Sequence, residues 1–347
     1  MNANEKQMNR CLELAKRGIE NVSPNPMVGC VIVFRGEIIG EGYHQKYGEA
    51  HAEVNAINAV ADPTLLAEST LFVTLEPCAH FGLTPPCSDL IVEKQIPKVV
   101  IGTIDPFAEV AGKGIEKMRN AGIDVEVGVL ENECREINKR FFTFHEKKRP
   151  YIMLKWAQTI DGFIDIDRTE REFGAPTWIT GNKALLRVHK MRAEEDAIMV
   201  GTKTAEKDNP SLTVRHCEGK NPIRVVLDKN LRLTENLNIF DGTVKTIIFN
   251  SIKNKKSGNN LFVKIDFDIE IIPQILNKLY KQKILSVIIE GGKQLLESFI
   301  DENIWDEAYQ FIGNKYFYSG INAPHISGNI IGSEILDSDK LIVYKNQ

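Results

Sequence analysis

The sequence alternates short apolar runs, each long enough for one buried strand, with segments of helical periodicity. In the first part of the chain the runs 29–34, 71–75 and 99–102 are strand-like, and a helical pattern at 52–60 separates the first two. Alternation of this kind is typical of folds in which helices cover a mostly parallel sheet. We therefore expect an α/β fold, with a three-layer α/β/α sandwich in the N-terminal part.

One charged segment, 147–150 (Lys-Lys-Arg-Pro), interrupts this alternation. It is polar and ends in proline, which is typical of a boundary between domains. The 347 residues suit two domains, since a domain usually contains about 100–200 residues. We predict one domain at 1–146 and a second at 150–347.

The second domain resumes the alternation with a strand-like run at 151–156. A further strand is predicted at 269–272, directly before a helix at 273–282. The polar segment 252–260 predicts a loose surface loop. No Gly-x-Gly-x-x-Gly motif follows the first strand, which argues against a Rossmann domain.

The charge and hydropathy patterns argue against nucleic acids and membranes as partners. The formal net charge is −4, whereas a nucleic-acid binder usually has a basic domain or patch. No run of apolar residues is long enough to span a bilayer, and residues 1–6 lack the apolar core of a signal peptide. We expect a cytoplasmic protein that acts on small molecules and whose six cysteines are reduced, catalytic or metal-bound.

Three residues in the first domain form a pattern typical of a catalytic zinc site. His51 begins a helical segment, and Cys78 and Cys87 each follow a proline. One imidazole and two thiolates supply the three protein ligands of such a site, which keeps its fourth position for water. Glu53 lies two residues after His51, where its carboxylate can carry a proton from this water to a leaving ammonia. His-x-Glu followed by two cysteines is the signature of zinc deaminases.

Each cysteine alone has an ordinary alternative explanation, since an isolated buried cysteine is usually a small apolar residue. The joint pattern of His51, Cys78 and Cys87 is much more specific. Residues 79–86 separate the two cysteines, more than the signature allows, and predict a longer loop at the mouth of the site. The remaining cysteines are not part of such a pattern and are expected to be structural: Cys11, Cys30, Cys134 and Cys217.

Longer motifs in both domains resemble the bifunctional riboflavin-biosynthesis deaminase–reductase family. In the first domain they are Pro-Asn-Pro-Met-Val-Gly at 24–29, His-Ala-Glu at 51–53, Thr-Leu-Glu-Pro-Cys-Ala-His at 74–80 and Thr-Pro-Pro-Cys at 84–87. In the second they are Leu-Lys-Trp-Ala-Gln-Thr-Ile-Asp-Gly at 154–162, Trp-Ile-Thr at 178–180, Asp-Asn-Pro-Ser-Leu-Thr-Val-Arg at 208–215 and Glu-Gly-Gly at 290–292. The long cysteine spacer is characteristic of this family, and the motifs occur in its order over nearly the whole chain.

The resemblance implies two consecutive reactions, with Zn²⁺ and NADPH as cofactors. The first domain, similar to cytidine deaminase, would remove the C2 amino group of 2,5-diamino-6-ribosylamino-4(3H)-pyrimidinone 5′-phosphate. The second, similar to dihydrofolate reductase, would use NADPH to reduce the ribosyl group of 5-amino-6-(5-phosphoribosylamino)uracil to ribityl. The family also suggests a homo-oligomer.

The resemblance assigns roles to residues beyond the zinc site. It implies substrate contacts of the deaminase at Asn25, His44 and His80, although both histidines could equally be hydrogen-bonded structural residues. In the reductase, it implies cofactor contacts at Ala157, Trp178, Thr204, Asp208 and from Gly292 onward. It implies substrate contacts at Arg192, Leu212, Arg215 and Glu290.

Physical chemistry alone says less about the second domain. Gly291 and Gly292 stand at a strand-to-helix turn, where the backbone can approach a phosphate at the helix N-terminus. Arg192 and Arg215 could hold a phosphate in bidentate fashion or be ordinary surface arginines.

The chain departs from the family pattern at three positions near the substrates. Leu83 stands where a basic residue is usual. Either another cation binds the 5′-phosphate, with Lys46 and Lys113 as candidates, or the deaminase binds its substrate more weakly than its relatives do; we favour the first explanation. Phe107 replaces a usual asparagine. Pro176 replaces the serine of a usual Gly-x-Ser and removes a hydroxyl contact from the reductase.

Two other functions fit parts of the pattern. A nucleoside or tRNA base deaminase fused to a nucleotide-binding regulatory domain would share the zinc motif, but the long cysteine spacer and the negative net charge argue against it. A zinc-stabilised binding protein with a ligand-sensing C-terminal half would not need Glu53, since a structural zinc site is normally closed by four protein ligands.

Overall fold

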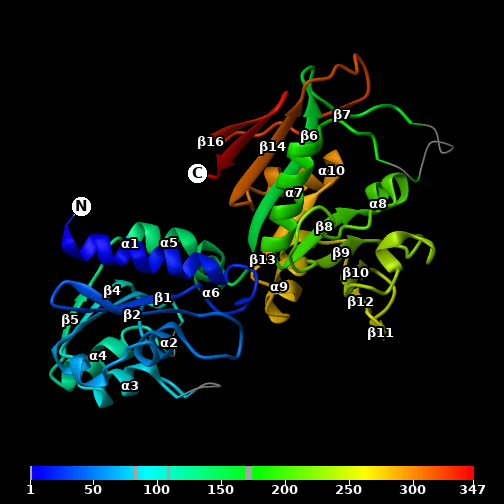
Figure 1. Ribbon diagram of the computed structural model, residues 1–347. Helices are drawn as coiled ribbons and strands as arrows, with labels where there is room; N and C mark the ends of the chain where they lie inside the picture. The colour runs from blue at the N-terminus through cyan, green and yellow to red at the C-terminus, as the bar shows by residue number, and fades with distance from the viewer. Residues whose placement is uncertain (1, 82–84, 108–109, 169–173, 175) are drawn as a thin grey trace. The chain divides into compact units, whose positions relative to one another are not determined.

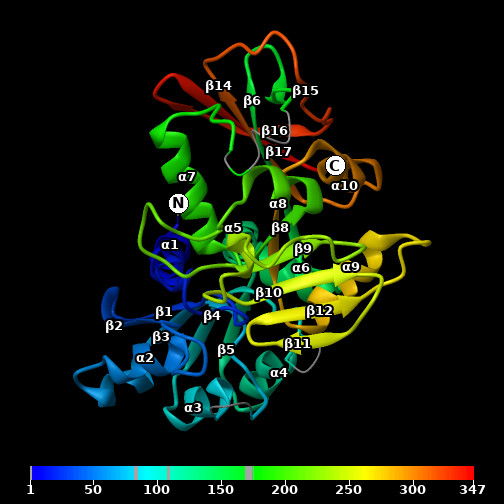
Figure 2. The ribbon, with the colours of Figure 1, turned by 90° about the vertical axis from the view of Figure 1, so that its right-hand side faces the viewer.

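The structure, a computed structural model, describes residues 2–81, 85–107, 110–168, 174 and 176–347. Leu83 lies outside the described residues. The chain forms two compact units, Met1–Lys148 and Arg149–Gln347. Each unit is built around its own sheet (Figures 1 and 2).

The N-terminal unit contains a five-stranded mixed sheet. Its strands are β1 (Gly29–Phe34), β2 (Glu37–Tyr43), β3 (Thr70–Leu75), β4 (Lys98–Thr103) and β5 (Asp124–Val127). They lie in the order β2-β1-β3-β4-β5. β1 pairs antiparallel with both of its neighbours, whereas β3, β4 and β5 run parallel.

Helices cover both faces of this sheet, as Figure 1 shows. On one face, α1 (Ala3–Ala15) and α5 (Glu131–Ile137) bury apolar side chains that include Met8 and Cys134. On the other, α2 (Ala52–Asn58), α3 (Cys87–Glu93) and α4 (Lys113–Asn120) form a second core. A further helix, α6 (Lys139–Lys147), ends the unit. The expected three-layer α/β/α sandwich is confirmed.

The C-terminal unit is built on a ten-stranded sheet. Its strands are β6 (Tyr151–Thr159), β8 (Ala197–Gly201), β9 (Ile223–Leu227), β10 (Thr246–Asn250), β11 (Lys255–Ser257), β12 (Asn260–Lys264), β13 (Ser286–Glu290), β14 (Glu307–Gly313), β16 (Asn329–Leu336) and β17 (Asp339–Lys345). They lie in the order β11-β12-β10-β9-β8-β13-β6-β14-β17-β16, and β12 through β14 in this order run parallel. Two short strands, β7 (Phe163–Asp165) and β15 (Ile321–Asn322), pair separately.

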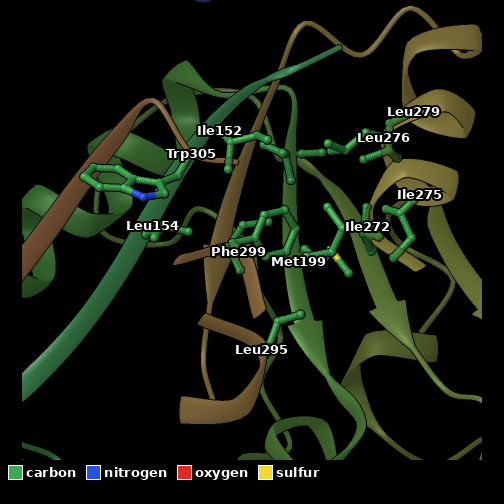
Figure 3. Close-up of a cluster of buried hydrophobic side chains, with 14 of the residues drawn as sticks. Ile152, Leu154, Met199, Ile272, Ile275, Leu276, Leu279, Leu295, Phe299 and Trp305 are labelled. Carbon is green, nitrogen blue, oxygen red and sulfur yellow. The ribbon is translucent and has the colours of Figure 1, made fainter. Parts of the chain in front are cut away.

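Helices also cover both faces of this second sheet. α7 (Asn182–Glu194) and α8 (Thr202–Asp208) pack on one face, where Val188 and Met191 are buried. α9 (Ile271–Lys281) and α10 (Lys293–Asp301) pack on the other. Figure 3 shows part of this second core, in which Leu276 and Phe299 lie among strand side chains that include Met199.

Two local predictions for this unit are wrong. The segment 269–272 is not a strand, since Ile269 is exposed and helix α9 already begins at Ile271. The amphipathic pattern of this helix directs Ile272 and Ile275 into the core. The polar segment 252–260 is not a loose loop, since it contains β11 and the start of β12. β12 has only three apolar residues, which lie between an asparagine and a lysine, yet it pairs in parallel with β10.

No helix among the described residues has both the length and the apolar character needed to cross a membrane.

Candidate functional sites

Three potential metal ligands converge in the N-terminal unit. Nδ1 of His51 lies 3.5 Å from Sγ of Cys78 and 3.3 Å from Sγ of Cys87. All three ligand atoms lie within 4.8 Å of one another. One imidazole nitrogen and two thiolates form a donor set that suits zinc, and three protein ligands leave one coordination position for water.

The starts of two helices hold these side chains in place. His51 is the N-cap of α2, so that Glu53 lies in the first turn of the same helix. Cys87 is the first residue of α3, and its backbone N–H donates to Sγ of Cys78 over 3.2 Å. This hydrogen bond ties the two cysteines together across their long sequence spacer.

The electrostatics of the cluster favour metal binding and proton transfer. Hydrogen bonds from Cys87 and His51 hold the pKa of the Cys78 thiol at about 4, against the effect of burial. Complete burial raises the pKa of Glu53 to about 7, although His51 opposes this shift. A carboxyl group with a pKa near neutrality can both accept and release a proton at physiological pH.

Two of the expected substrate contacts of the deaminase lie beside the cluster. The ring of His44 meets that of His51 edge to face, with centroids 5.5 Å apart. Nε2 of His44 is 3.1 Å from the side-chain nitrogen of Asn25, and its Nδ1 is 3.1 Å from the carbonyl oxygen of Ala50. The histidine is therefore hydrogen-bonded as a structural residue would be, and it also links Asn25 to the cluster.

The third expected contact, His80, belongs to an aromatic group. Its ring lies 5.9 Å from that of Phe107, which in turn lies 5.2 Å from that of His145 on α6. Nδ1 of His80 is buried and has no hydrogen-bond partner among the residues that the structure describes. Phe107, one of the departures from the family pattern, is thus accommodated by ring contacts on both sides.

Sequence reasoning assigned no role to Glu76, yet this buried carboxylate organises the loop before α4. It accepts hydrogen bonds from the backbone N–H groups of Gly112 (2.9 Å), Gly114 (3.0 Å) and Ile115 (3.3 Å). A fourth, longer bond comes from Asp105 (3.4 Å). The sequence feature that could have indicated this role is the position of Glu76, a charged residue directly after the apolar run 71–75.

A large cavity, about 1060 Å³, lies in the C-terminal unit at the carboxyl ends of β6, β8, β9 and β13. Ligands commonly bind at this edge of parallel α/β sheets. All nine residues expected to contact cofactor or substrate line the cavity: Ala157, Trp178, Thr204, Asp208, Gly292, Arg192, Leu212, Arg215 and Glu290. Pro176, the third departure, lines it as well.

The turn between β13 and α10 approaches α8 closely. The backbone N–H of Gly292 donates to Oγ1 of Thr204 over 2.8 Å. Gly291 has a φ of +101°, and a Cβ atom there would lie 2.7 Å from Cγ2 of Thr204. Only glycine fits this conformation and this contact.

A buried charge network forms one wall of the cavity. Nη2 of Arg192 donates to Glu290 over 2.9 Å, and Nζ of Lys155 lies 3.7 Å from the other carboxylate oxygen. Burial would raise the pKa of Glu290, but Arg192 and Lys155 outweigh it and hold the pKa at about 2. Lys155 was missed by sequence reasoning, although a lysine inside the apolar run 151–156 was a signal.

The fold and the two sites define a class: a zinc-type deaminase unit joined to a second α/β unit with a large ligand cavity. Residues 1–103 match the model of the cytidine and deoxycytidylate deaminase zinc-binding region, and residues 150–317 match the RibD C-terminal domain. The chain belongs to the RibD family of riboflavin biosynthesis proteins.

Similar proteins cover nearly the whole chain. RibD of Aquifex aeolicus is 40% identical over 323 residues, which is 91% of this chain and 88% of the relative. RibD of Bacillus amyloliquefaciens is 41% identical over 332 residues, 93% of this chain and 87% of the relative. The crystal structure of a diaminohydroxyphosphoribosylaminopyrimidine deaminase/5-amino-6-(5-phosphoribosylamino)uracil reductase from Thermotoga maritima matches with a TM-score of 0.89 and 38% identity over 99% of both chains.

The chain is therefore a bifunctional enzyme of riboflavin biosynthesis, with a deaminase unit and a reductase unit. Its cofactors are Zn²⁺ and NADPH. The expected fold classes, cytidine-deaminase-like and dihydrofolate-reductase-like, are confirmed.

Proposed function

We propose that the two units act in sequence on one pyrimidine ribose phosphate. The N-terminal unit hydrolyses the C2 amino group of 2,5-diamino-6-ribosylamino-4(3H)-pyrimidinone 5′-phosphate. The C-terminal unit then reduces the ribosyl group of 5-amino-6-(5-phosphoribosylamino)uracil to ribityl. The observation that carries the proposal is the cluster of His51, Cys78 and Cys87 beside the buried Glu53.

In the deaminase, His51, Cys78 and Cys87 hold the zinc. A zinc ion held there would supply Lewis-acid chemistry and would make water a usable nucleophile near neutral pH. Glu53 accepts a proton from this water and delivers it to the departing ammonia. Its burial beside the cluster excludes bulk water from the proton path.

Asn25, His44 and His80 orient the pyrimidine over the deaminase site. The hydrogen bond between Asn25 and His44 fixes the orientation of the Asn25 amide and of the His44 ring. Because residue 83 is a leucine, the 5′-phosphate is bound by a cation elsewhere in the chain, with Lys46 and Lys113 as candidates. Nζ of Lys46 lies 3.8 Å from an exposed carboxylate of Glu49, a weak ion pair that a phosphate can replace.

In the reductase, the glycine turn and the residues near it bind NADPH, and a second set of cavity-lining residues binds the substrate. The cofactor contacts are Ala157, Trp178, Thr204, Asp208 and Gly292, and the substrate contacts are Arg192, Leu212, Arg215 and Glu290. Arg192 is engaged by Glu290, whereas the exposed guanidinium of Arg215 has no partner among the described residues. Arg215 is therefore the better phosphate ligand.

The glycine turn makes a testable prediction for cofactor binding. Gly291→Ala places a methyl group against Thr204 and should raise the Kd for NADPH about tenfold or more, measured by fluorescence titration. Gly258→Ala is a matched control, since Gly258 also has a positive φ but faces open space. Equal Kd values for the two variants would contradict the placement of NADPH at this turn.

We further propose that the functional domains are residues 1–146 and 150–347. A fragment that begins at Lys147 should be soluble and should oxidise NADPH in the presence of the deaminated substrate. It retains Arg149, whose guanidinium forms a bidentate pair with Asp306 at 2.5 and 2.9 Å. A fragment that aggregates, or one that folds but does not oxidise NADPH, would show that the reductase needs the first 146 residues.

A panel of amino substrates tests the proposed deamination. We expect ammonia release from the diaminopyrimidine phosphate and none from cytidine or from adenosine in tRNA. Release from either of the latter would instead favour a nucleoside or tRNA deaminase.

The protein is further proposed to be a cytoplasmic homo-oligomer that does not bind nucleic acid, in line with its net charge of −4. Ile330, Ile331 and Ile335 are exposed on the edge strand β16, a surface that a second copy could cover. Sedimentation analysis should give a mass above that of one chain.

A further inference from the structure

Helix α7 contacts the segment that carries two proposed substrate ligands of the reductase, Leu212 and Arg215. His189 and Arg192 are three residues apart on α7 and therefore lie on the same face of the helix. His189 is fully buried, and both side chains belong to the cavity wall. The sequence did not indicate that α7 contacts this segment.

Both side chains bind the backbone of this segment. The backbone N–H of Arg215 donates to Nδ1 of His189 over 3.1 Å. Nη1 of Arg192 donates to the carbonyl oxygen of Thr213 over 3.3 Å. Between α8 and these anchors, Leu212 is buried with a φ of +53°, a left-handed conformation that is costly for leucine and requires support from its surroundings.

The hydrogen bond from Arg215 defines the tautomer of His189. Because Nδ1 accepts, the neutral ring carries its proton on Nε2, which is buried and has no partner within the described part of the chain. Burial, together with the nearby Arg192, His216 and Arg215, lowers the pKa of His189 to about 4, against the effect of Glu290. The ring of His216 packs edge to face on it at 4.6 Å. His189 thus remains a neutral acceptor throughout the physiological pH range.

We propose that His189 is a positioning residue of the reductase, which holds the backbone of Arg215 so that its guanidinium stays at the substrate side of the cavity. This inference rests on the proposed role of Arg215 in substrate binding. His189 has no solvent-exposed surface, and its Nδ1 is engaged by the backbone N–H of Arg215, so we infer that it acts through Arg215. Loss of the Nδ1 acceptor should weaken substrate binding and leave cofactor binding intact, because Thr204 and Gly292 do not contact this segment through any described hydrogen bond.

Two substitutions separate the acceptor from the bulk of the ring. His189→Leu retains an apolar side chain without an acceptor, whereas His189→Asn keeps an oxygen at the position of Nδ1, one bond beyond Cγ. We expect His189→Leu to raise the KM for 5-amino-6-(5-phosphoribosylamino)uracil about tenfold, as for one lost hydrogen bond, with kcat and the Kd for NADPH nearly unchanged. His189→Asn should remain close to the wild-type KM.

A double-mutant cycle shows whether His189 acts through Arg215. In an Arg215→Ala background, His189→Leu should add little to the KM, because the guanidinium that it positions is already absent. Additive effects, or equal losses in the leucine and asparagine variants, would overturn the proposal. So would a His189→Leu variant with the wild-type KM.

A measurement on the unmodified protein needs no substitution and no substrate. Nitrogen-15 NMR of the histidine rings should show His189 as the Nε2–H tautomer at pH 7 and still neutral at pH 6. A doubly protonated ring at pH 6, or an Nδ1–H tautomer, would overturn the proposal even if the variants fail to fold. A wild-type enzyme without reductase activity would contradict the proposed function instead and would leave this spectrum unchanged.

Discussion

Glu53→Gln should retain zinc and lose deamination by a factor of at least about 10²–10⁴, the usual contribution of a general acid–base group. The amide preserves the shape of the side chain but cannot accept and release a proton. Its environment should tolerate the change, since burial already disfavours the charged carboxylate. The measurements are zinc content by elemental analysis and ammonia release from the diaminopyrimidine phosphate.

The same variant also tests the separation of the two sites. NADPH-dependent reduction of pre-deaminated substrate should persist in Glu53→Gln, because the cavity of the C-terminal unit contains none of the deaminase residues. Glu49→Gln is a matched control, since Glu49 is exposed and pairs only weakly with Lys46. Loss of both activities from a folded, zinc-loaded Glu53→Gln enzyme would contradict the two-site account.

Removal of the thiolates of Cys78 and Cys87 should have a second large effect, on zinc content and on deamination. The Cys78→Ala, Cys87→Ala double variant should contain no stoichiometric zinc, whereas the wild type should contain about one ion per chain. Deamination should become undetectable, and the reductase should stay active. In a cobalt-substituted wild-type sample, absorption bands should report thiolate ligation, and these bands should be absent from the variant.

Cys217→Ala serves as the control for cysteine removal, since Cys217 lies in the other unit and is partly exposed. Its zinc content and deamination should equal those of the wild type. A full equivalent of zinc in the double variant would show that the ion is held elsewhere and that the assignment of His51, Cys78 and Cys87 is wrong.

The zinc cluster could be predicted because its chemistry restricts the residue types. Only a few side chains bind zinc, and the glutamate two residues from the histidine has no purpose in a closed structural site. The alternation of strands and helices predicted the layers in the same way, because each buried strand needs a covering helix. Both inferences depend on local patterns.

What the sequence did not predict depends on distant partners. The pairing of Phe107 with His80 and His145, and the anchoring of Arg215 by His189, join residues that no local pattern connects. The error at 252–260 has a related cause. A short strand such as β12 is defined by its neighbour β10, not by its own composition.

Lys155 illustrates a further limit of local patterns. Within an apolar run it interrupts the pattern of a buried strand, but the structure places its ammonium group beside Glu290 in the cavity wall. A charge in a buried strand is explained only when its counter-ion is known, and Glu290 lies on a different strand.

The most direct test of the central claim is to follow one substrate through both reactions in one purified protein. The zinc-loaded enzyme is incubated with 2,5-diamino-6-ribosylamino-4(3H)-pyrimidinone 5′-phosphate, with and without NADPH, and the products are separated by chromatography. Without NADPH, the deaminated ribosylamino product should accumulate together with ammonia; with NADPH, it should be replaced by the ribitylamino product as NADPH is oxidised. Absence of ammonia in both reactions, or a product pattern that NADPH does not change, would contradict the account.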